Sequence, residues 1–238
     1  MSRTGLVIPL FLSLALMALA AGCGSSEKAE NAEGTTTTSS VPGHAGHRGD
    51  QQYGGVHAPP VVKASELAKY GDGPQVGDTW TASIGVNVCG RFLDPLPGVA
   101  TNGLTPQPNG TIQLAPRTKA ESGLALTLAD YSMAVGLDLE TGELSLPDTV
   151  TPSEIPVRDS NVPLAGQTFK DGADCGGTKA NVVVWVYSAE AVETGKGLVT
   201  VVENPEDIPF PTDGMAMVIT LSPESSLPTL PPSVVQTG

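Results

Sequence analysis

Apolar and polar residues alternate most regularly between Trp80 and Cys89. The odd-numbered residues of this stretch are mostly small and polar, and the even-numbered ones are apolar: Trp80, Ala82, Ile84, Val86 and Val88. Strict period two is typical of a strand with one buried face. We therefore predict a strand over 80–89, ended by the Pro and Gly residues that follow it.

Apolar runs in the C-terminal half predict further strands. Ala180–Tyr187 is β-branched and aromatic almost throughout, which is typical of a central strand buried on both faces. Leu198–Val202 and Met215–Leu221 are two more apolar runs of strand length. The segment Asn204–Gly214 between them carries three Pro and three acidic residues, and it predicts an exposed loop.

Turn and capping signals place two hairpins and two helices in the remaining chain. Asn109-Gly110 and the segment 140–143 each lie between short apolar runs, as hairpin turns do. Thr127–Val135 has apolar residues at spacings of three and four, a capping Thr at its start and Gly136 after its end. Val62–Tyr70 predicts a second, short helix.

Together these elements predict an α+β fold, with five to seven short strands in a mostly antiparallel or mixed β-sheet and one or two short helices. We expect a single domain over residues 61–222. The sequence after Pro223 is rich in Pro and Ser, which predicts a flexible tail over 223–238.

The first 22 residues have the pattern of an export signal. Arg3 precedes 17 uncharged residues, Gly5–Ala21, and Gly22-Cys23 follows directly. A charged start, an apolar stretch and a small-residue cleavage site are typical of a secretory signal peptide. A transmembrane anchor and a secreted protein without lipid are the alternatives, since 17 apolar residues are close to the length that spans a bilayer.

The residues Ala20-Ala21-Gly22-Cys23 resemble the lipobox of bacterial lipoproteins, with Ala20 where that family usually has Leu. The resemblance implies a lipoprotein signal peptide over 1–22 and a lipid on Cys23. It also implies a protein anchored to the cell membrane, on its extracytoplasmic face. Two or three acyl chains would hold the protein stably at the membrane.

Residues 23–60 are dominated by Ser, Thr, Gly, Glu and Ala and show almost no apolar periodicity. Such a segment cannot bury enough apolar surface to offset the entropy of ordering, so we predict a disordered tether. All three histidines lie in it: His44, His47 and His57. The first two are close enough to share a metal ion, but no Cys or carboxylate cluster completes a ligand set.

The chain carries 12 basic and 25 acidic residues, a net charge of −13. This charge argues against nucleic acid as a partner and against binding to anionic lipids through a basic patch. The predicted domain contains no His, and it shows no nucleophile elbow, phosphate loop or zinc motif. We therefore assign no catalytic, cofactor-binding or metal residue from the sequence.

Two cysteines, Cys89 and Cys175, remain if Cys23 carries the lipid. Two thiols in a protein exported to an oxidising compartment predict a disulfide. A pair of unlinked buried thiols is the alternative.

Several blocks resemble a group of uncharacterised secreted and membrane-anchored actinobacterial proteins over roughly residues 76–233. The blocks are Asp78-x-Trp80, Val88–Leu93, Asp174–Gly177, Val184-Trp185 and Pro231–Ser233. That group carries His beside the Trp and in the block that corresponds to Asn102–Pro116, where this chain has none. The resemblance thus implies no metal or acid–base chemistry for this chain.

The leading hypothesis is a non-catalytic module, anchored to the membrane, that binds an unidentified protein or envelope ligand. The alternative is a hydrolase that uses a carboxylate pair, either Asp171 with Asp174 or Glu206 with Asp207. Such a pair works as acid and base only where its surroundings separate the two pKa values. Metal capture by the His-containing tether is a third possibility.

Overall fold

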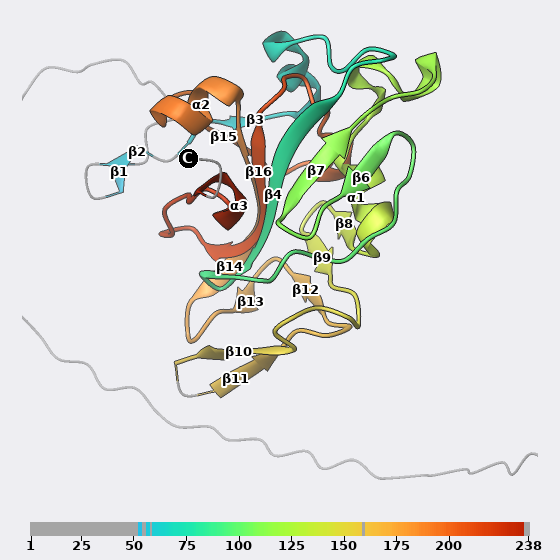
Figure 1. Ribbon diagram of the computed structural model, residues 1–238. Coiled ribbons are helices and arrows are strands. Elements are labelled where there is room, and N and C mark those ends of the chain that lie inside the picture. The colour runs from blue at the N-terminus through green and yellow to red at the C-terminus, as the bar shows by residue number, and fades with distance from the viewer. Residues whose placement is uncertain (1–51, 54–55, 58, 159, 236–238) are drawn as a thin grey trace, which may run out of the picture. The chain divides into compact units, whose positions relative to one another are not determined.

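The computed structural model describes residues 52–53, 56–57, 59–158 and 160–235 (Figure 1). These residues belong to one compact unit that extends over residues 47–238. The predicted signal peptide, Cys23, His44 and His47 lie outside the described residues. Within the described part of the chain, no helix is both long and apolar enough to cross a membrane.

A nine-stranded mixed sheet organises the described residues, and this confirms the predicted α+β class (Figure 1). Seven strands follow one another across it: β3 (Val61–Val62), β15 (Val199–Val201), β14 (Lys179–Tyr187), β16 (Ala216–Pro223), β4 (Trp80–Val88), β7 (Thr111–Leu114) and β6 (Leu104–Pro106). The short strands β13 (Ala173–Asp174) and β5 (Arg91–Phe92) pair with β14 and β4. The pairs β3–β15 and β16–β4 are parallel, and the others are antiparallel.

The two nine-residue strands, β4 and β14, lie where the sequence predicts strands. In β4 the apolar residues at even positions, from Ala82 onward, are buried, as the alternation requires. Strand β16, between β14 and β4, is buried along nearly its whole length. It pairs antiparallel with β14 and parallel with β4, and so forms the middle of the sheet.

The main hydrophobic core includes the predicted helix α1 (Leu128–Val135). The Thr127 side chain accepts a hydrogen bond from the Ala129 N–H, and the Asp130 carboxylate accepts one from the Thr127 N–H (3.0 Å). Gly136 ends the helix in the left-handed region, with φ of 71°. The capping signals therefore act as predicted, and the other predicted helix forms as the 3₁₀ helix η1 (Ala64–Tyr70).

The segment Asn204–Gly214 differs from the predicted exposed loop. It forms the 3₁₀ helix η4 (Pro205–Asp207), and both Ile208 and Phe210 are completely buried in the main core. The Ile208 carbonyl accepts a hydrogen bond from the Leu128 N–H (2.8 Å), which joins this segment to the start of α1. All three of its prolines are buried as well, whereas its acidic residues are exposed or half-buried.

Smaller elements lie beside the main sheet. The predicted hairpin of β8 (Asp138–Glu140) and β9 (Glu143–Ser145) is extended by β12 (Thr168–Lys170) into a three-stranded sheet. The sequence does not predict the hairpin of β10 (Glu154–Val157) and β11 (Ser160–Pro163) or the 3₁₀ turns η2 (Lys119–Glu121) and η3 (Gly123–Ala125). A short hairpin of β1 (Gln52–Tyr53) and β2 (Val56–His57) falls within the segment expected to be a tether.

A second, smaller cluster of buried residues includes Trp185 and Tyr187 of β14 and Ala191 of α2 (Ala189–Thr194). Leu230 and Val234 pack against it from the C-terminal segment, which ends in α3 (Pro232–Val235). In Figure 1, α3 lies over the sheet. The sequence predicts a flexible tail over 223–238. This prediction is corrected for the segment that carries Leu230 and Val234, because it packs on the domain. Residues 236–238 lie outside the described residues.

Candidate functional site

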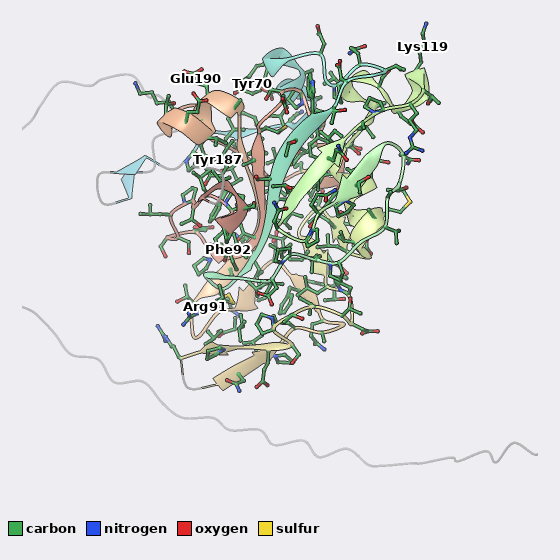
Figure 2. The ribbon with its side chains drawn as sticks, in the orientation of Figure 1. Tyr70, Arg91, Phe92, Lys119, Tyr187 and Glu190 are labelled. Carbon is green, nitrogen blue, oxygen red and sulfur yellow. A yellow bond between two sulfur atoms is a disulfide. The ribbon has the colours of Figure 1, made fainter. Side chains whose placement is uncertain are left out.

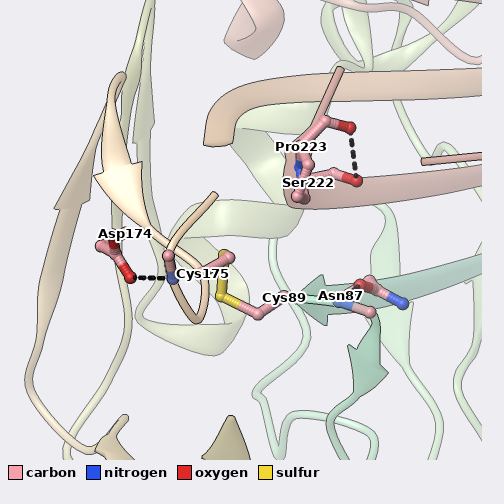
Figure 3. Close-up of a disulfide and its surroundings, with 8 residues drawn as sticks. Asn87, Cys89, Asp174, Cys175, Ser222 and Pro223 are labelled. Atoms are coloured by element: carbon pink, nitrogen blue, oxygen red, sulfur yellow. Dashed lines mark hydrogen bonds between the residues drawn. A yellow bond between two sulfur atoms is a disulfide. The ribbon is translucent and has the colours of Figure 1, made fainter. Parts of the chain in front are cut away.

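The disulfide predicted between Cys89 and Cys175 is present, with the two Cα atoms 5.3 Å apart (Figure 3). Cys89 follows the end of β4 with φ of 51°, and Cys175 follows β13. A side chain stabilises each turn. The side-chain oxygen of Asn87 accepts from the Gly90 N–H (3.0 Å), and the Asp174 carboxylate accepts from the Gly177 N–H (2.7 Å). The bond joins the first long strand to the turn that leads into β14.

The sheet has a break beside β4. Strand β7 pairs with β4 only over Trp80–Ser83, and β5 pairs with it only at Asn87 and Val88. At the two ends of the break, the Ile84 N–H donates to the Gly110 carbonyl (3.0 Å) and the Leu93 N–H donates to the Val86 carbonyl (2.9 Å). Since the N–H and C=O of one strand residue point the same way, the Ile84 carbonyl and the Val86 N–H face the break.

A pocket of about 270 Å³ occupies this break. We call it the sheet-break pocket. Its lining residues come from β4, from β5 and the segment after it, from the tip of the β6–β7 hairpin, and from α1 and α3: Ile84, Gly85, Val86, Phe92, Leu93, Asp94, Pro95, Leu96, Asn109, Gly110, Tyr131, Pro232 and Ser233. Tyr131 belongs to the main core, whereas Phe92 packs against the smaller cluster, beside α3 (Figure 2). The pocket is therefore walled from both faces of the sheet.

Ser233 of α3 contributes to this wall, and its hydroxyl is buried behind the surface of the pocket. The residue is only 4% exposed, and its Oγ has no hydrogen-bond partner in the structure. A buried hydroxyl without a partner costs roughly 1–3 kcal/mol. Gly110, with φ of 83°, lies directly beside it: a Cβ there would be 3.3 Å from the Ser233 Cβ. The missing side chain at Gly110 leaves room for Ser233 to enter the wall.

Two further polar side chains complete the lining. Tyr131 projects from α1, and its burial raises the pKa of the phenol above the ordinary value of 10.0, so the hydroxyl stays protonated at neutral pH. The side-chain oxygen of Asn109 accepts from the Thr111 N–H (3.1 Å) and from the Thr111 hydroxyl (2.8 Å). The side-chain NH₂ group of Asn109 is left for other partners. Asp94 is exposed at the pocket's edge.

The carboxylate pairs considered from the sequence do not line this pocket. Asp171 accepts from the Val182 N–H (2.7 Å), and Asp174 accepts from the Gly177 N–H. Both therefore hold backbone turns. Glu206 and Asp207 lie in η4, where one Glu206 oxygen is buried without a partner.

No group of three or more His, Cys, Asp or Glu that could hold a metal ion occurs among the residues that the structure describes. Of the three histidines, only the backbone of His57 is described, in β2. Metal capture by the tether therefore stays a prediction.

A second, more open hollow of about 670 Å³ lies beside the start of β4. Trp80 and three aspartates line it: Asp72, Asp78 and Asp213. Asp78 accepts from the Gln75 N–H (2.8 Å) and so closes its own loop, and Asp213 accepts from the Thr81 N–H (2.7 Å) and so joins its loop to β4. Their positions are explained by the fold alone.

The chain was compared with protein-family models, with curated proteins and with solved structures, and nothing matches it. The resemblances to bacterial lipoproteins and to the actinobacterial group therefore stay predictions. The candidate site rests on the geometry of this chain alone.

Sequence reasoning does not find the pocket. The Asn109-Gly110 turn is plain from the sequence, but nothing there shows that it lies beside Ile84. The helical spacing of Tyr131 predicts only a core residue, and Ser233 lies in the segment expected to be a flexible tail. The repeated Pro residues around Ser233 are the available signal, because Pro restricts the chain and lowers the entropy lost when it packs.

Proposed function

We propose that this protein is a lipid-anchored, extracytoplasmic binding module that holds a small envelope ligand in the sheet-break pocket. Cys23 would carry the lipid, and the segment 23–60 would separate the domain from the membrane. The domain would bind its ligand without catalysing a reaction. The pocket is built from five separate segments of the chain, as binding sites in small domains commonly are.

One observation carries the binding function: the sheet-break pocket brings together polar groups from separate segments of the chain, among them the Tyr131 hydroxyl and the Asn109 side-chain NH₂ group. The Asn109 side-chain oxygen is used by Thr111, which leaves the NH₂ group for a ligand. A pocket with an apolar lining and a few convergent polar groups is the usual form of a small-molecule site.

Binding is favoured over hydrolysis because the pocket holds one carboxylate, Asp94, and that carboxylate is exposed. Acid–base hydrolysis by carboxylates needs two of them in different surroundings. The described residues that line the pocket include no His or Cys that could replace the second group.

The binding function can be tested by closing the pocket. In Asp94→Trp an indole replaces an exposed side chain at the pocket's edge, so the fold is expected to survive. Asp138→Trp, on the exposed side of β8, is the matched control. Ligand-observed NMR of the full-length chain with neutral sugars, amines, carboxylates and phosphate should show binding that Asp94→Trp removes and Asp138→Trp keeps. If no ligand signal depends on Asp94→Trp, the pocket is not the binding site.

The anchor gives a separate prediction. Replacing Cys23 by Ser should abolish lipid attachment, because the serine cannot form the thioether, and should move the protein from the membrane fraction to the soluble fraction. Fractionation followed by immunoblotting measures this shift. Ser25→Ala is the control, because it changes a nearby residue that carries no lipid. Equal membrane partitioning of Cys23→Ser and wild type would show that the anchor is a different one.

A further inference from the structure

The chemistry of the sheet-break pocket points to a class of ligand: we propose that it binds one neutral sugar ring, or a neutral polyol of that size. This inference rests on the proposed function, since it names the ligand of the same pocket. It is carried by the charge of the lining, by the polar groups in its wall and by its size.

The lining favours a neutral ligand. None of the described residues that line the pocket is Lys, Arg or His, and the one charged group is the Asp94 carboxylate. A phosphate or carboxylate ligand would lie near Asp94 without a positive partner, which is unfavourable in a partly buried site. A cation would meet a single exposed carboxylate, and ion pairs of that kind contribute little to binding.

The polar groups suit a ligand whose own groups both donate and accept. The hydroxyl of Tyr131 can both donate and accept, and sugar hydroxyls do the same. The Asn109 NH₂ group and the Val86 N–H add donors, and the Ile84 carbonyl adds an acceptor. A ring with several hydroxyls can use donors and acceptors on opposite walls at once.

The apolar part of the lining and the size of the pocket fit one ring. Phe92, Pro95 and Pro232 provide surfaces for the C–H groups of a sugar ring. Gly85 lets the aromatic ring approach the strand: a Cβ there would lie 2.9 Å from Phe92 Cε1. The volume of about 270 Å³ is just below the range of about 300–1,000 Å³ that holds drug-sized ligands.

The structure supplies a matched control variant for the Tyr131 hydroxyl. Tyr131→Phe removes this hydroxyl from the pocket wall. Tyr187 carries a buried hydroxyl without a partner, and it does not line the pocket. Tyr187→Phe therefore repeats the same chemical change elsewhere in the domain.

The test is a titration of the full-length chain with glucose, N-acetylglucosamine and myo-inositol, beside ethanolamine, acetate and inorganic phosphate. Calorimetry or ligand-observed NMR gives each dissociation constant. We expect binding of at least one neutral compound, and a rise in its dissociation constant of about three- to tenfold in Tyr131→Phe. Tyr187→Phe should stay within about twofold of wild type.

The outcomes separate the ligand class from the proposed function. Binding of ethanolamine, acetate or phosphate that weakens in Tyr131→Phe, with no neutral compound bound, would overturn the ligand class and leave the binding pocket in place. Binding of a sugar that Tyr131→Phe and Tyr187→Phe both leave unchanged would place the sugar elsewhere and overturn the inference. If no probe binds, and if Asp94→Trp gives the same signals as wild type, then water alone fills the pocket and both proposals are wrong.

Discussion

Replacing Cys89 by Ala is expected to lower the free energy of unfolding by about 4–5 kcal/mol as an upper value. The two cysteines are 86 positions apart, so the bond closes a long loop in the unfolded chain and restricts its entropy. The melting temperature should fall by roughly 10 °C. Thermal unfolding followed by circular dichroism, for the oxidised and the reduced wild type as well as the variant, measures the effect.

The matched variants are Cys175→Ala and the double variant with Cys89→Ala. If the bond is the cause, the three variants should melt at nearly the same temperature, because the second substitution has no bond left to remove. The effects of independent sites would add instead. Melting temperatures equal to that of oxidised wild type would contradict the role given to this disulfide.

Replacing Phe210 by Ala should lower the free energy of unfolding by about 3–5 kcal/mol. The side chain is completely buried in the main core, in a segment whose composition predicts an exposed loop. Its truncation leaves a cavity as well as losing apolar burial. Urea unfolding at constant pH, with the midpoint and the slope fitted together, gives the change.

The control for this variant is Val99→Ala. Val99 is 71% exposed, and surface truncations usually change stability by less than about 0.5 kcal/mol. A loss at Phe210 as small as the loss at Val99 would show that the segment 204–214 is not part of the core.

The sequence by itself predicts the elements whose signals are local. Strand β4 follows from its two-residue alternation, and α1 follows from Thr127, Asp130 and Gly136, because capping groups act within one turn of the helix. The α+β class follows from the balance of such elements. The pairing of Cys89 with Cys175 follows from the number of cysteines if, as predicted, Cys23 carries a lipid, because one pair then remains.

The order of the strands is decided by long-range pairing. No local signal places β16 parallel to β4 and antiparallel to β14, although the apolar content of all three strands is plain from the sequence. The hairpin of β10 and β11 has only four residues in each strand and a Pro in both, so its local signal is weak.

Burial of Phe210 and Ser233 is likewise decided by the tertiary structure. Both lie in Pro-rich segments whose composition is typical of exposed chain, and both are buried because distant elements offer them a surface. The sheet-break pocket has the same origin. It exists because β7 and β5 leave one edge of β4 without a strand partner at Ile84–Val86, where the other edge pairs with β16, and because Tyr131 and Ser233 reach this break from opposite faces of the sheet. Such convergence depends on contacts between residues far apart in the chain, and residue type and spacing do not encode it.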